Sequence, residues 1–211
     1  MKVKLVTDFY DIYDIWFDRE GDTVLERLTT SGLSRGPMLR FLNDKGIQTV
    51  RFGTCEELSA IGCKKVVVYK DTNTHCGNGK ILMDAMDATM SFPNFLASEY
   101  CPLHKGVSIR HLQLGELWFK LQYKSVDDWR SNCGSDVDIK VLDCGVGYHE
   151  TIDAPIFAID FVETADGLMA IDYNIAPGCR WTGIEQLVKP KVIAESIKSA
   201  IEKNLIKTQE A

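Results

Sequence analysis

The segment between residues 157 and 178, FAIDFVETADGLMAIDYNIAPG, constrains the fold of this chain more than any other. Apolar residues alternate with polar ones on both sides of an Asp-Gly pair at positions 166 and 167. This pattern is typical of two antiparallel strands joined by a tight turn. Because side chains alternate between the two faces of a strand, the length of the loop decides which residues share a face.

One loop length brings three oxygen-bearing side chains of this hairpin together. If the loop is residues 165–167, with Gly167 in the left-handed conformation, Asp160 lies opposite Asp172. Asn174 then joins them on the same face, because it lies two residues beyond Asp172. A two-residue loop would separate the two aspartates onto opposite faces, so this register is a specific prediction.

Two carboxylates about 5 Å apart on one face of a sheet repel each other unless a cation lies between them. Carboxylate and amide oxygens suit Mg²⁺ that is held together with the phosphate groups of a substrate. Asp160, Asp172 and Asn174 are therefore candidate ligands of a metal ion. The alternative is a surface hairpin with solvated aspartates, and this segment by itself does not decide between the two.

Composition excludes several classes of protein. The 211 residues, 45% hydrophobic and 26% charged, are sufficient for one large soluble domain or two small ones. A net charge of −6 argues against a general nucleic-acid surface. No apolar run reaches the roughly 20 residues that span a bilayer, and no signal-peptide pattern is present. The seven cysteines lack metal-binding spacing, so thiols in a reducing cytoplasm are expected.

The rest of the chain alternates between strand-like and helix-like segments. The sequence predicts strands at 2–7, 47–52, 65–70, 95–100, 107–112, 116–123 and 137–144. It predicts helices at 37–45, 56–61 and 81–90, and a final helix beginning at Pro190. The final helix carries apolar residues at four-residue spacing, which indicates core packing or a partner contact.

A lysine and a glycine-rich loop follow the apolar strand predicted at 65–70. Lys70 ends this strand, and Gly77 and Gly79 lie in the loop. Glycines let backbone N–H groups approach phosphate oxygens, and a lysine at a strand end supplies positive charge. The spacing fits neither a P-loop nor a dinucleotide fingerprint, and a plain turn is the commoner interpretation of such a loop.

Two further segments carry candidate binding groups. Residues 98–101, Ser-Glu-Tyr-Cys, form an extended hinge whose backbone could bind an adenine edge, although any strand that ends in a turn has this pattern. Arg110 and Arg130 are candidates to stabilise charge that develops beside a phosphate group. Arg110 fits the role of an ordinary surface arginine equally well.

In this order and spacing, the four segments resemble the ATP-grasp proteins, and most closely the branch with the ribosomal-protein glutamate ligases. The hinge at 98–101 resembles the family's Q-E-Y-I, and Lys70 matches its strand-end lysine. Gly77 and Gly79 match the glycines of the family's mobile loop, Ile109-Arg110 matches its D-I-R strand, and Arg130-Ser131-Asn132 matches its R-S-N element. Asp160, Asp172 and Asn174 match its metal ligands. The resemblance favours the metal-site interpretation of the hairpin.

The resemblance covers about residues 34–205 and implies an α+β fold. In the ATP-grasp fold, two α+β subdomains enclose ATP between them, and they correspond here to about 34–96 and 97–211. The preceding segment, 1–33, is much shorter than the N-terminal domain of most relatives. Its opening sequence resembles short ATP-grasp proteins carried by bacterial viruses, so the expected location is a cytoplasm, that of the host if the chain is viral.

This chain also departs from the family at several positions. The second metal ligand is more often glutamate, whereas Asp172 keeps the charge with a shorter reach. Ser108 replaces an acidic residue that precedes the Ile-Arg pair in close relatives. The early lysine that contacts phosphate in many relatives has no equivalent here, and Arg35 or Arg40 is the candidate to replace it.

The function implied by the resemblance is ATP-dependent ligation of a carboxylate to an amine. This reaction proceeds through an acylphosphate, forms ADP and needs one or two Mg²⁺ ions. Arg110 and Arg130 are then the expected catalytic residues. The expected nucleotide-binding residues are Lys70, Gly77, Gly79, Glu99, Tyr100, Cys101 and Asn132.

Two other functions stay open at the level of sequence. An ATP-grasp kinase or phosphotransferase would stop after phosphorylation, and a non-catalytic module would only bind ATP. The acid and the amine are unidentified and can be small molecules, peptides or proteins. No membrane partner is expected, and the short front end is compatible with a homodimer.

Overall fold

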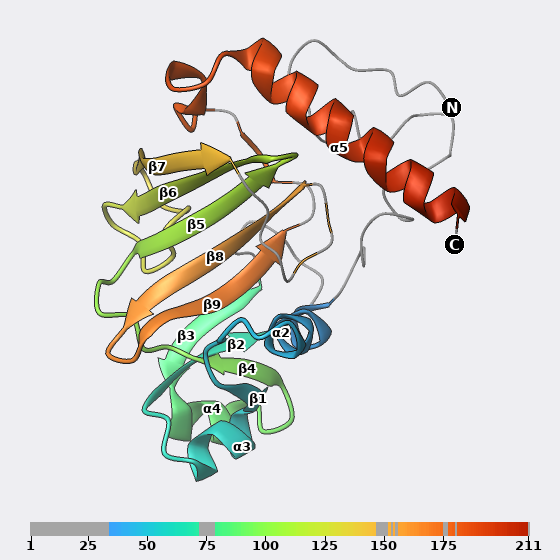
Figure 1. Cartoon of the computed structure of the whole chain (residues 1–211). Helices are drawn as coiled ribbons and strands as arrows, with labels where there is room; N and C mark the ends of the chain where they lie inside the picture. The colour runs from blue at the N-terminus through green and yellow to red at the C-terminus, as the bar shows by residue number, and fades with distance from the viewer. Residues whose placement is uncertain are drawn as a thin grey trace.

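The computed structural model of the chain describes residues 34–71, 79–146, 152, 154, 156–174, 177–179 and 181–210 (Figure 1). The predicted strand at 2–7, the whole of segment 1–33 and Gly77 lie outside the described residues. The described part of the chain contains two antiparallel sheets and several helices. This arrangement confirms the predicted α+β class.

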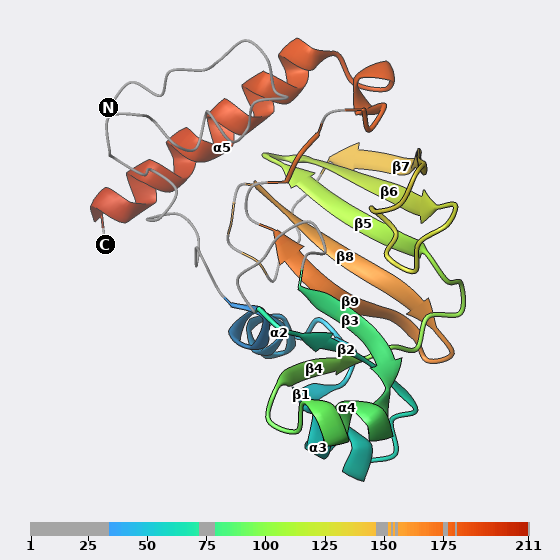
Figure 2. The same cartoon turned by 180° about the vertical axis from the view of Figure 1, so that it is seen from behind.

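The smaller sheet has the strand order β1-β4-β2-β3, and the larger has the order β7-β6-β5-β8-β9. The smaller sheet lies beyond β9, the edge strand of the larger one (Figure 2). Its strands are β1 (Phe52–Thr54), β2 (Lys65–Tyr69), β3 (Lys80–Asp84) and β4 (Leu96–Glu99). The larger sheet contains β5 (Val107–Leu114), β6 (Leu117–Ser125), β7 (Val137–Val146), β8 (Ile156–Thr164) and β9 (Gly167–Asn174). The helices are α2 (Arg35–Asp44), α3 (Cys55–Ala60), α4 (Ala85–Ser91), the short 3₁₀ helix η2 (Ile184–Gln186) and α5 (Pro190–Glu210).

The smaller sheet buries one face against helices α3 and α4. Val66 and Val68 of β2 belong to the core cluster that these helices complete. Val67 and Tyr69 alternate with them and therefore face the other side of the sheet. Helix α3 begins with a capping box at Thr54, which satisfies orphan backbone N–H groups of its first turn. The face that carries Tyr69 is the one that meets the candidate site.

The predicted helix at 81–90 is wrong in its first half. Residues 80–84 form β3, which pairs along its whole length with β2, and only α4 is helical. The run Ile-Leu-Met at 81–83 is short and apolar, and such a run suits a strand as well as a helix. Met86 and Met90, which a single long helix would have turned toward the core, are 67% and 73% exposed.

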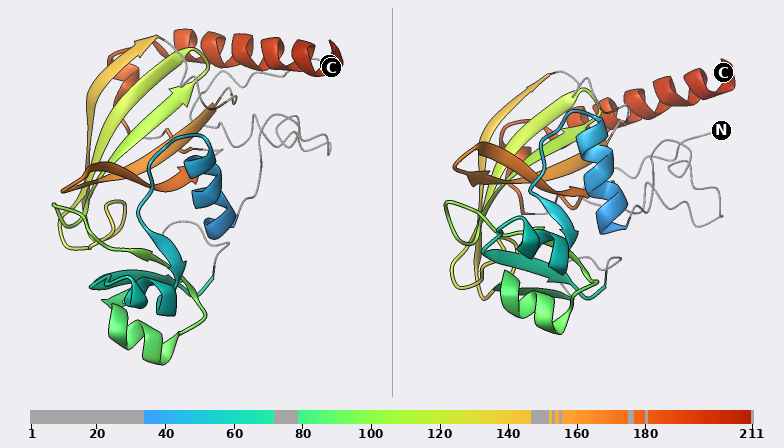
Figure 3. Two further views of the ribbon diagram at one scale, coloured as in Figure 1. Left: turned by 60° about the horizontal axis from the view of Figure 1, so that its bottom comes forward. Right: turned by 90° about the horizontal axis from the view of Figure 1, so that it is seen from below.

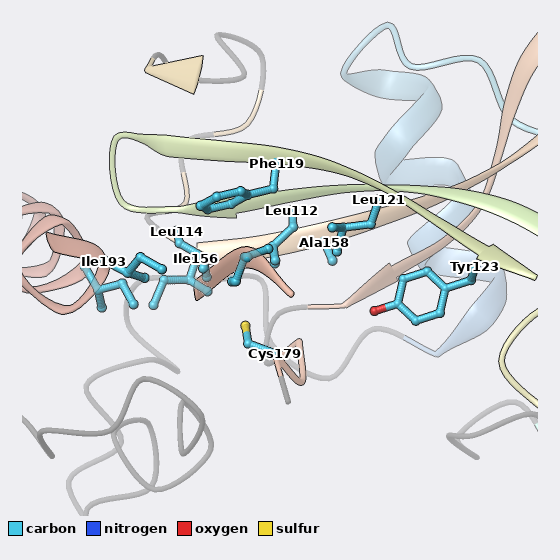
Figure 4. Close-up of a cluster of buried hydrophobic side chains, with 11 residues drawn as sticks. Leu112, Leu114, Phe119, Leu121, Tyr123, Ile156, Ala158, Cys179 and Ile193 are labelled. Atoms are coloured by element: carbon cyan, nitrogen blue, oxygen red, sulfur yellow. The ribbon is translucent and has the colours of Figure 1, made fainter. Parts of the chain in front are cut away.

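The larger sheet is covered on both faces, and each face has its own core. Helix α2 packs on one face against β8 and β9, through residues that include Leu39 and Phe157. The segment around Ile184 and the first part of α5 cover the other face, where Leu112 and Phe119 lie (Figure 4). Helix α5 crosses one end of this sheet and extends past it (Figure 3).

Most other predicted elements are confirmed, with small shifts at their ends. The segment predicted as a strand at 47–52 becomes β1 only from Phe52 onward. Its earlier residues lie beside β9, where Ala170 N–H donates to Gln48 O at 2.8 Å and Val50 N–H donates to Ala170 O at 3.2 Å. Among the described residues, no helix is long and apolar enough to cross a membrane.

Candidate active site

The hairpin formed by β8 and β9 brings Asp160 and Asp172 directly opposite each other in the register. Asn174 lies two residues beyond Asp172 on the same strand. The loop, however, contains two residues rather than three, because Thr164 pairs with Gly167. Gly167 has a φ of 106°, so its positive φ was predicted correctly.

An extra residue in β9 compensates for the shorter loop. Phe161 pairs with Ala170 and Asp160 pairs with Asp172, so Ile171 forms a β-bulge between them. The bulge reverses the alternation of side chains and returns Asp172 to the face of Asp160. The predicted pairing of the aspartates is therefore confirmed, whereas the predicted three-residue loop is wrong.

Arg110 forms a bidentate ion pair with Asp160 from the neighbouring strand β5. Its Nε donates to Oδ1 at 2.6 Å and its Nη2 donates to Oδ2 at 2.9 Å. The two side chains are only 11% and 15% exposed. Nη1 also donates to the Tyr123 hydroxyl at 3.3 Å. Burial alone would lower the pKa of Arg110, but the charge and hydrogen bonds of Asp160 raise it, so the guanidinium stays positive.

Arg35, the first residue of α2, forms an ion pair with Asp172. Its Nη1 donates to Asp172 Oδ1 at 2.5 Å and to Ile171 O at 3.1 Å. The guanidinium lies 5.2 Å from the centre of the Tyr69 ring on β2, so Arg35 links the two sheets. Arg35 is 7% exposed, whereas Arg40 is exposed. Of the two arginines suggested by the sequence, the structure places Arg35 beside the carboxylates.

Lys80 is a further cation of the site, which sequence analysis did not single out. It is the first residue of β3, lies opposite Tyr69 and has its ammonium group 6.0 Å from the Tyr69 ring. Burial is the main cause that lowers the pKa of Lys80, and the charge of Arg35 lowers it further. The charges of Asp172 and Asp160 raise the pKa of Lys80, so both carboxylates lie close enough to interact electrostatically with its ammonium group.

The charges of this cluster leave a local positive surplus. Among the described residues, three cations, Arg35, Lys80 and Arg110, surround two carboxylates, which gives a formal charge of +1 in a chain whose net charge is −6. Partly buried charges of one sign attract ligands of the opposite sign more strongly than exposed ones do. A polyanion such as a triphosphate matches this surplus.

The oxygen donors of the hairpin fit a hard divalent cation. Among the described residues no group of three or more His, Cys, Asp or Glu side chains is arranged to hold a metal, so a metal here would need ligands beyond the two aspartates. Asn174 offers an amide oxygen on the same strand as Asp172. The described hydrogen bonds of Asp172 all end on Oδ1, which leaves Oδ2 for another cation. Two carboxylates, one amide and substrate phosphates are a suitable donor set for Mg²⁺.

The residues of the expected adenine hinge face different sides of the smaller sheet. Glu99 lies opposite Val66, on the face covered by α3 and α4, and its carboxylate accepts two hydrogen bonds from Arg51 at 2.8 Å and 2.6 Å. The backbone N–H groups of Glu99 and Tyr100 donate to Arg51 O and Lys65 O. Hinge donors for a ligand would therefore have to come from residue 101 onward.

Tyr100 lies at the end of β4, where the chain leaves the smaller sheet. Its ring makes an edge contact with Trp129 at a centroid distance of 5.7 Å. Its hydroxyl is buried and has no hydrogen-bond partner among the described residues. Burial raises the pKa of the neighbouring Cys101 to about 11, so this thiol is not ionised at neutral pH. The roles of Glu99, Tyr100 and Cys101 in binding a nucleotide stay predictions.

The loop after β6 carries the predicted Arg130 and Asn132. Arg130 forms a bidentate ion pair with Asp128 in its own loop, at 2.9 Å and 2.7 Å, and these hydrogen bonds lower the pKa of Asp128 to about 2. Ser131 and Ser108 share a hydrogen bond of 2.5 Å between their hydroxyl groups, which ties the loop to β5. Asn132 is exposed. Catalysis by Arg130 and nucleotide binding by Asn132 stay predictions.

The structure does not bring Lys70 to the carboxylates. Lys70 follows Tyr69 and its ammonium group lies 5.4 Å from the Phe92 ring, on the side of the smaller sheet packed by α4. Its backbone N–H donates to Gly79 O at 2.8 Å, and Gly79 has a φ of 67°. Lys80, rather than Lys70, shares the face of Tyr69.

Comparisons with known proteins agree with this architecture. No protein-family model matches the sequence, and no curated protein matches it. Among solved structures, the D-alanine–D-alanine ligase from Bacillus anthracis has a TM-score of 0.58 at 12% identity, over 84% of this chain and 69% of its own. The D-cycloserine synthetase DcsG also has a TM-score of 0.58, at 11% identity, over 88% and 80%. A RimK domain ATP-grasp protein from Sphaerobacter thermophilus has a TM-score of 0.51 at 16% identity, over 84% and 68%.

These similarities show that the chain has the ATP-grasp fold, as the order of its sequence motifs predicted. Identities between 11% and 16% carry the fold and not the reaction. The chemistry has to be argued from the side chains that the two sheets bring together.

Proposed function

We propose that this protein is an ATP-dependent, ADP-forming carboxylate–amine ligase. The observation that carries the proposal is the cluster in which Asp160 and Asp172 face each other on β8 and β9, within the field of cations contributed by both sheets. An ATP-grasp fold with this cluster can bind a triphosphate and stabilise the charge that moves during phosphoryl transfer. The ligase structures with the same fold support the carboxylate–amine class.

The chain's own cations would hold the phosphate groups. Lys80 and Arg35 lie on the side where the smaller sheet meets β9, and both groups are shielded from water, which strengthens their attraction for anions. Arg110 is held by Asp160 and Tyr123, so its guanidinium is already oriented beside the site before a substrate binds. We assign Arg35 and Lys80 to the phosphates of ATP and Arg110 to the charge of the reacting groups.

Asp160, Asp172 and Asn174 would hold Mg²⁺, which when bound supplies charge neutralisation at the phosphate oxygens. Arg110 and Arg35 now occupy oxygens of the two aspartates, so they orient the carboxylates until the ion binds. The same contacts limit electrostatic repulsion between the two aspartates.

The proposed chemistry has two steps. A carboxylate oxygen of the acid attacks the terminal phosphorus of ATP, and the bond to the bridging oxygen breaks to release ADP. The amine then attacks the carbonyl carbon of the acylphosphate, loses a proton, and inorganic phosphate leaves as the amide forms. Arg110 is placed to stabilise the negative charge of both stages, and exclusion of water would protect the acylphosphate.

Trapping with hydroxylamine tests this proposal without knowledge of the natural amine. The chain is incubated with ATP, Mg²⁺ and pools of amino acids, short peptides and small carboxylic acids, with and without hydroxylamine. We expect one pool to give ADP, phosphate and a hydroxamate in equal amounts, because hydroxylamine replaces the amine. Mass spectrometry of the product identifies the acid.

The other two functions give different outcomes in the same assay. A kinase forms ADP and a phosphorylated product, without a hydroxamate and without phosphate release that depends on an amine. A binding module retains ATP and forms no ADP with any pool. Either outcome, obtained with correctly folded protein, contradicts the ligase proposal.

Replacement of Lys80 by methionine should stabilise the free protein and weaken nucleotide binding. Burial lowers the pKa of Lys80, so the unfolded chain binds this proton more readily than the folded one, and stability rises as the pH approaches the ordinary value of 10.5. We expect Lys80→Met to raise the Tm by roughly 2–4 °C at neutral pH, with the difference shrinking as the pH rises toward 10.5. ATP affinity should fall at least roughly 10-fold, as measured by calorimetry.

Lys70→Met is the matched control, because Lys70 is exposed and lies over Phe92. It should leave the Tm at neutral pH and the ATP affinity nearly unchanged. If Lys70→Met weakens ATP binding and Lys80→Met does not, the assignment of the phosphates to the Tyr69 face is wrong.

A further inference from the structure

We propose that the outer edge of β7 is a self-association surface, on which β7 of a second copy pairs in the antiparallel direction. The two five-stranded sheets then continue into one sheet across a two-fold axis. This inference is independent of the ligase proposal, since it rests on β7 and not on the site residues.

Strand β7 is an unusually long free edge. It has ten residues, pairs with β6 on one side, and has no neighbouring strand on its other side among the described residues. Exposed edges of this length offer a row of backbone donors and acceptors to another strand. Its apolar residues Val146 and Leu142 are 77% and 48% exposed, so pairing with a second strand would remove apolar surface from water.

A β-bulge in β7 restricts the register in which it can pair with itself. Leu121 pairs with Val141 and Lys120 pairs with Asp143, so Leu142 is the extra residue. Before the bulge the odd-numbered residues of β7 face the core, and after it the even-numbered ones do. The register that places Val141 opposite Leu142 of the second copy brings the two bulges together and keeps the core-facing residues on either side of the bulge paired with core-facing residues.

In that register all ten residues of β7 find a partner. On the core-facing side, Val137 meets Val146 of the second copy and Ile139 meets Cys144 of the second copy. These pairs cover the exposed valine with apolar surface. A two-fold axis repeats each contact, as an isologous interface requires.

The charges on the opposite face complement each other in the same register. Lys140 lies opposite Asp143 of the second copy, and this pair occurs twice across the two-fold axis. Among the residues that the structure describes, Lys140 forms an exposed ion pair with Asp138 of its own strand, at 3.1 Å. Asp143 is exposed beside Lys120 of β6, so it would bridge two lysines in the dimer. Opposite charges that face each other across neighbouring strands stabilise the pairing, and like charges oppose it.

Charge reversal and restoration test both the surface and the register. We expect the native chain to sediment with twice the 23.7 kDa mass of one copy. Lys140→Asp and Asp143→Lys each place two like-charged pairs in the interface, and each should weaken the dimer by roughly 10-fold or more. The double variant, with both changes, restores the opposite charges and should dimerise as the native chain does.

Lys105→Asp is the matched control, because it makes the same charge change at an exposed position outside β7. It should leave the dimer intact. Circular dichroism and Tm confirm that each variant is folded. A native chain that is monomeric at every concentration overturns the proposal, and so does a dimer that Lys140→Asp and Asp143→Lys do not weaken. A double variant that stays as weak as the single ones overturns the register.

Discussion

Replacement of Asp172 by asparagine is expected to reduce ADP formation by roughly 100-fold or more at saturating Mg²⁺. The substitution keeps the shape of the side chain and removes one of the two negative charges of the proposed metal site. It also removes the charge that orients Arg35, whose Nη1 donates to Asp172 Oδ1 at 2.5 Å. Two proposed functions, ion binding and orientation of a phosphate-binding arginine, are therefore lost together. Initial rates of ADP release with the acid identified by trapping provide the measurement.

Asp166→Asn is the control for this prediction, because Asp166 lies in the exposed loop of the same hairpin. It should keep native activity. Near-native turnover of Asp172→Asn would show that the carboxylate pair does not act in the reaction. A loss that higher Mg²⁺ concentrations partly reverse would support ion binding as the main effect.

The second large effect concerns stability and the ion pair between Arg110 and Asp160. Arg110→Met should lower the free energy of unfolding by about 3–5 kcal/mol, because it leaves the 15% exposed Asp160 without its bidentate partner. Asp160→Leu should lower the free energy of unfolding by a similar amount, because it leaves the buried guanidinium of Arg110 without its partner carboxylate. The double variant should cost much less than the sum, because it removes both charges from the interior together. Urea unfolding of the four proteins gives the coupling energy.

The ion pair between Arg51 and Glu99 provides the comparison. It has the same bidentate geometry, with distances of 2.8 Å and 2.6 Å, but Arg51 is 50% exposed. Arg51→Met should therefore cost about 0–1 kcal/mol, since water screens such a pair. Equal costs for Arg51→Met and Arg110→Met would contradict the view that the Arg110 pair is shielded.

The sequence predicted the fold of this protein better than the positions of the side chains in its candidate site. The order of motifs predicted the ATP-grasp fold through its resemblance to that family, and local patterns marked most of the helices and strands. The pairing of Asp160 with Asp172 was also predicted correctly. The reason given for it was wrong, since a bulge depends on tertiary packing and leaves no mark in a single sequence.

Lys80 could not be found from the sequence for a related reason. Lys80 was placed at the end of the glycine-rich loop and the rest of its strand was assigned to a helix, so without the pairing of β3 with β2 nothing places Lys80 opposite Tyr69. Arg35 was one of two candidates, because only the packing of α2 shows which arginine turns inward. The sequence motif assigned Lys70 to nucleotide binding, but the alternation of side chains along β2 turns it toward Phe92.

The β-bulge at Ile171 lies between the tip of the hairpin and the part that carries Asp160 and Asp172. A three-residue loop without a bulge and a two-residue loop with one both place Asp160 beside Asp172, so the spacing in the chain is compatible with either backbone path. The tip can therefore change its pairing by one residue while the carboxylates keep their positions. A single insertion or deletion between the aspartates keeps both carboxylates on one face only when the loop or the bulge absorbs it, so the length of this segment and its bulge are constrained together.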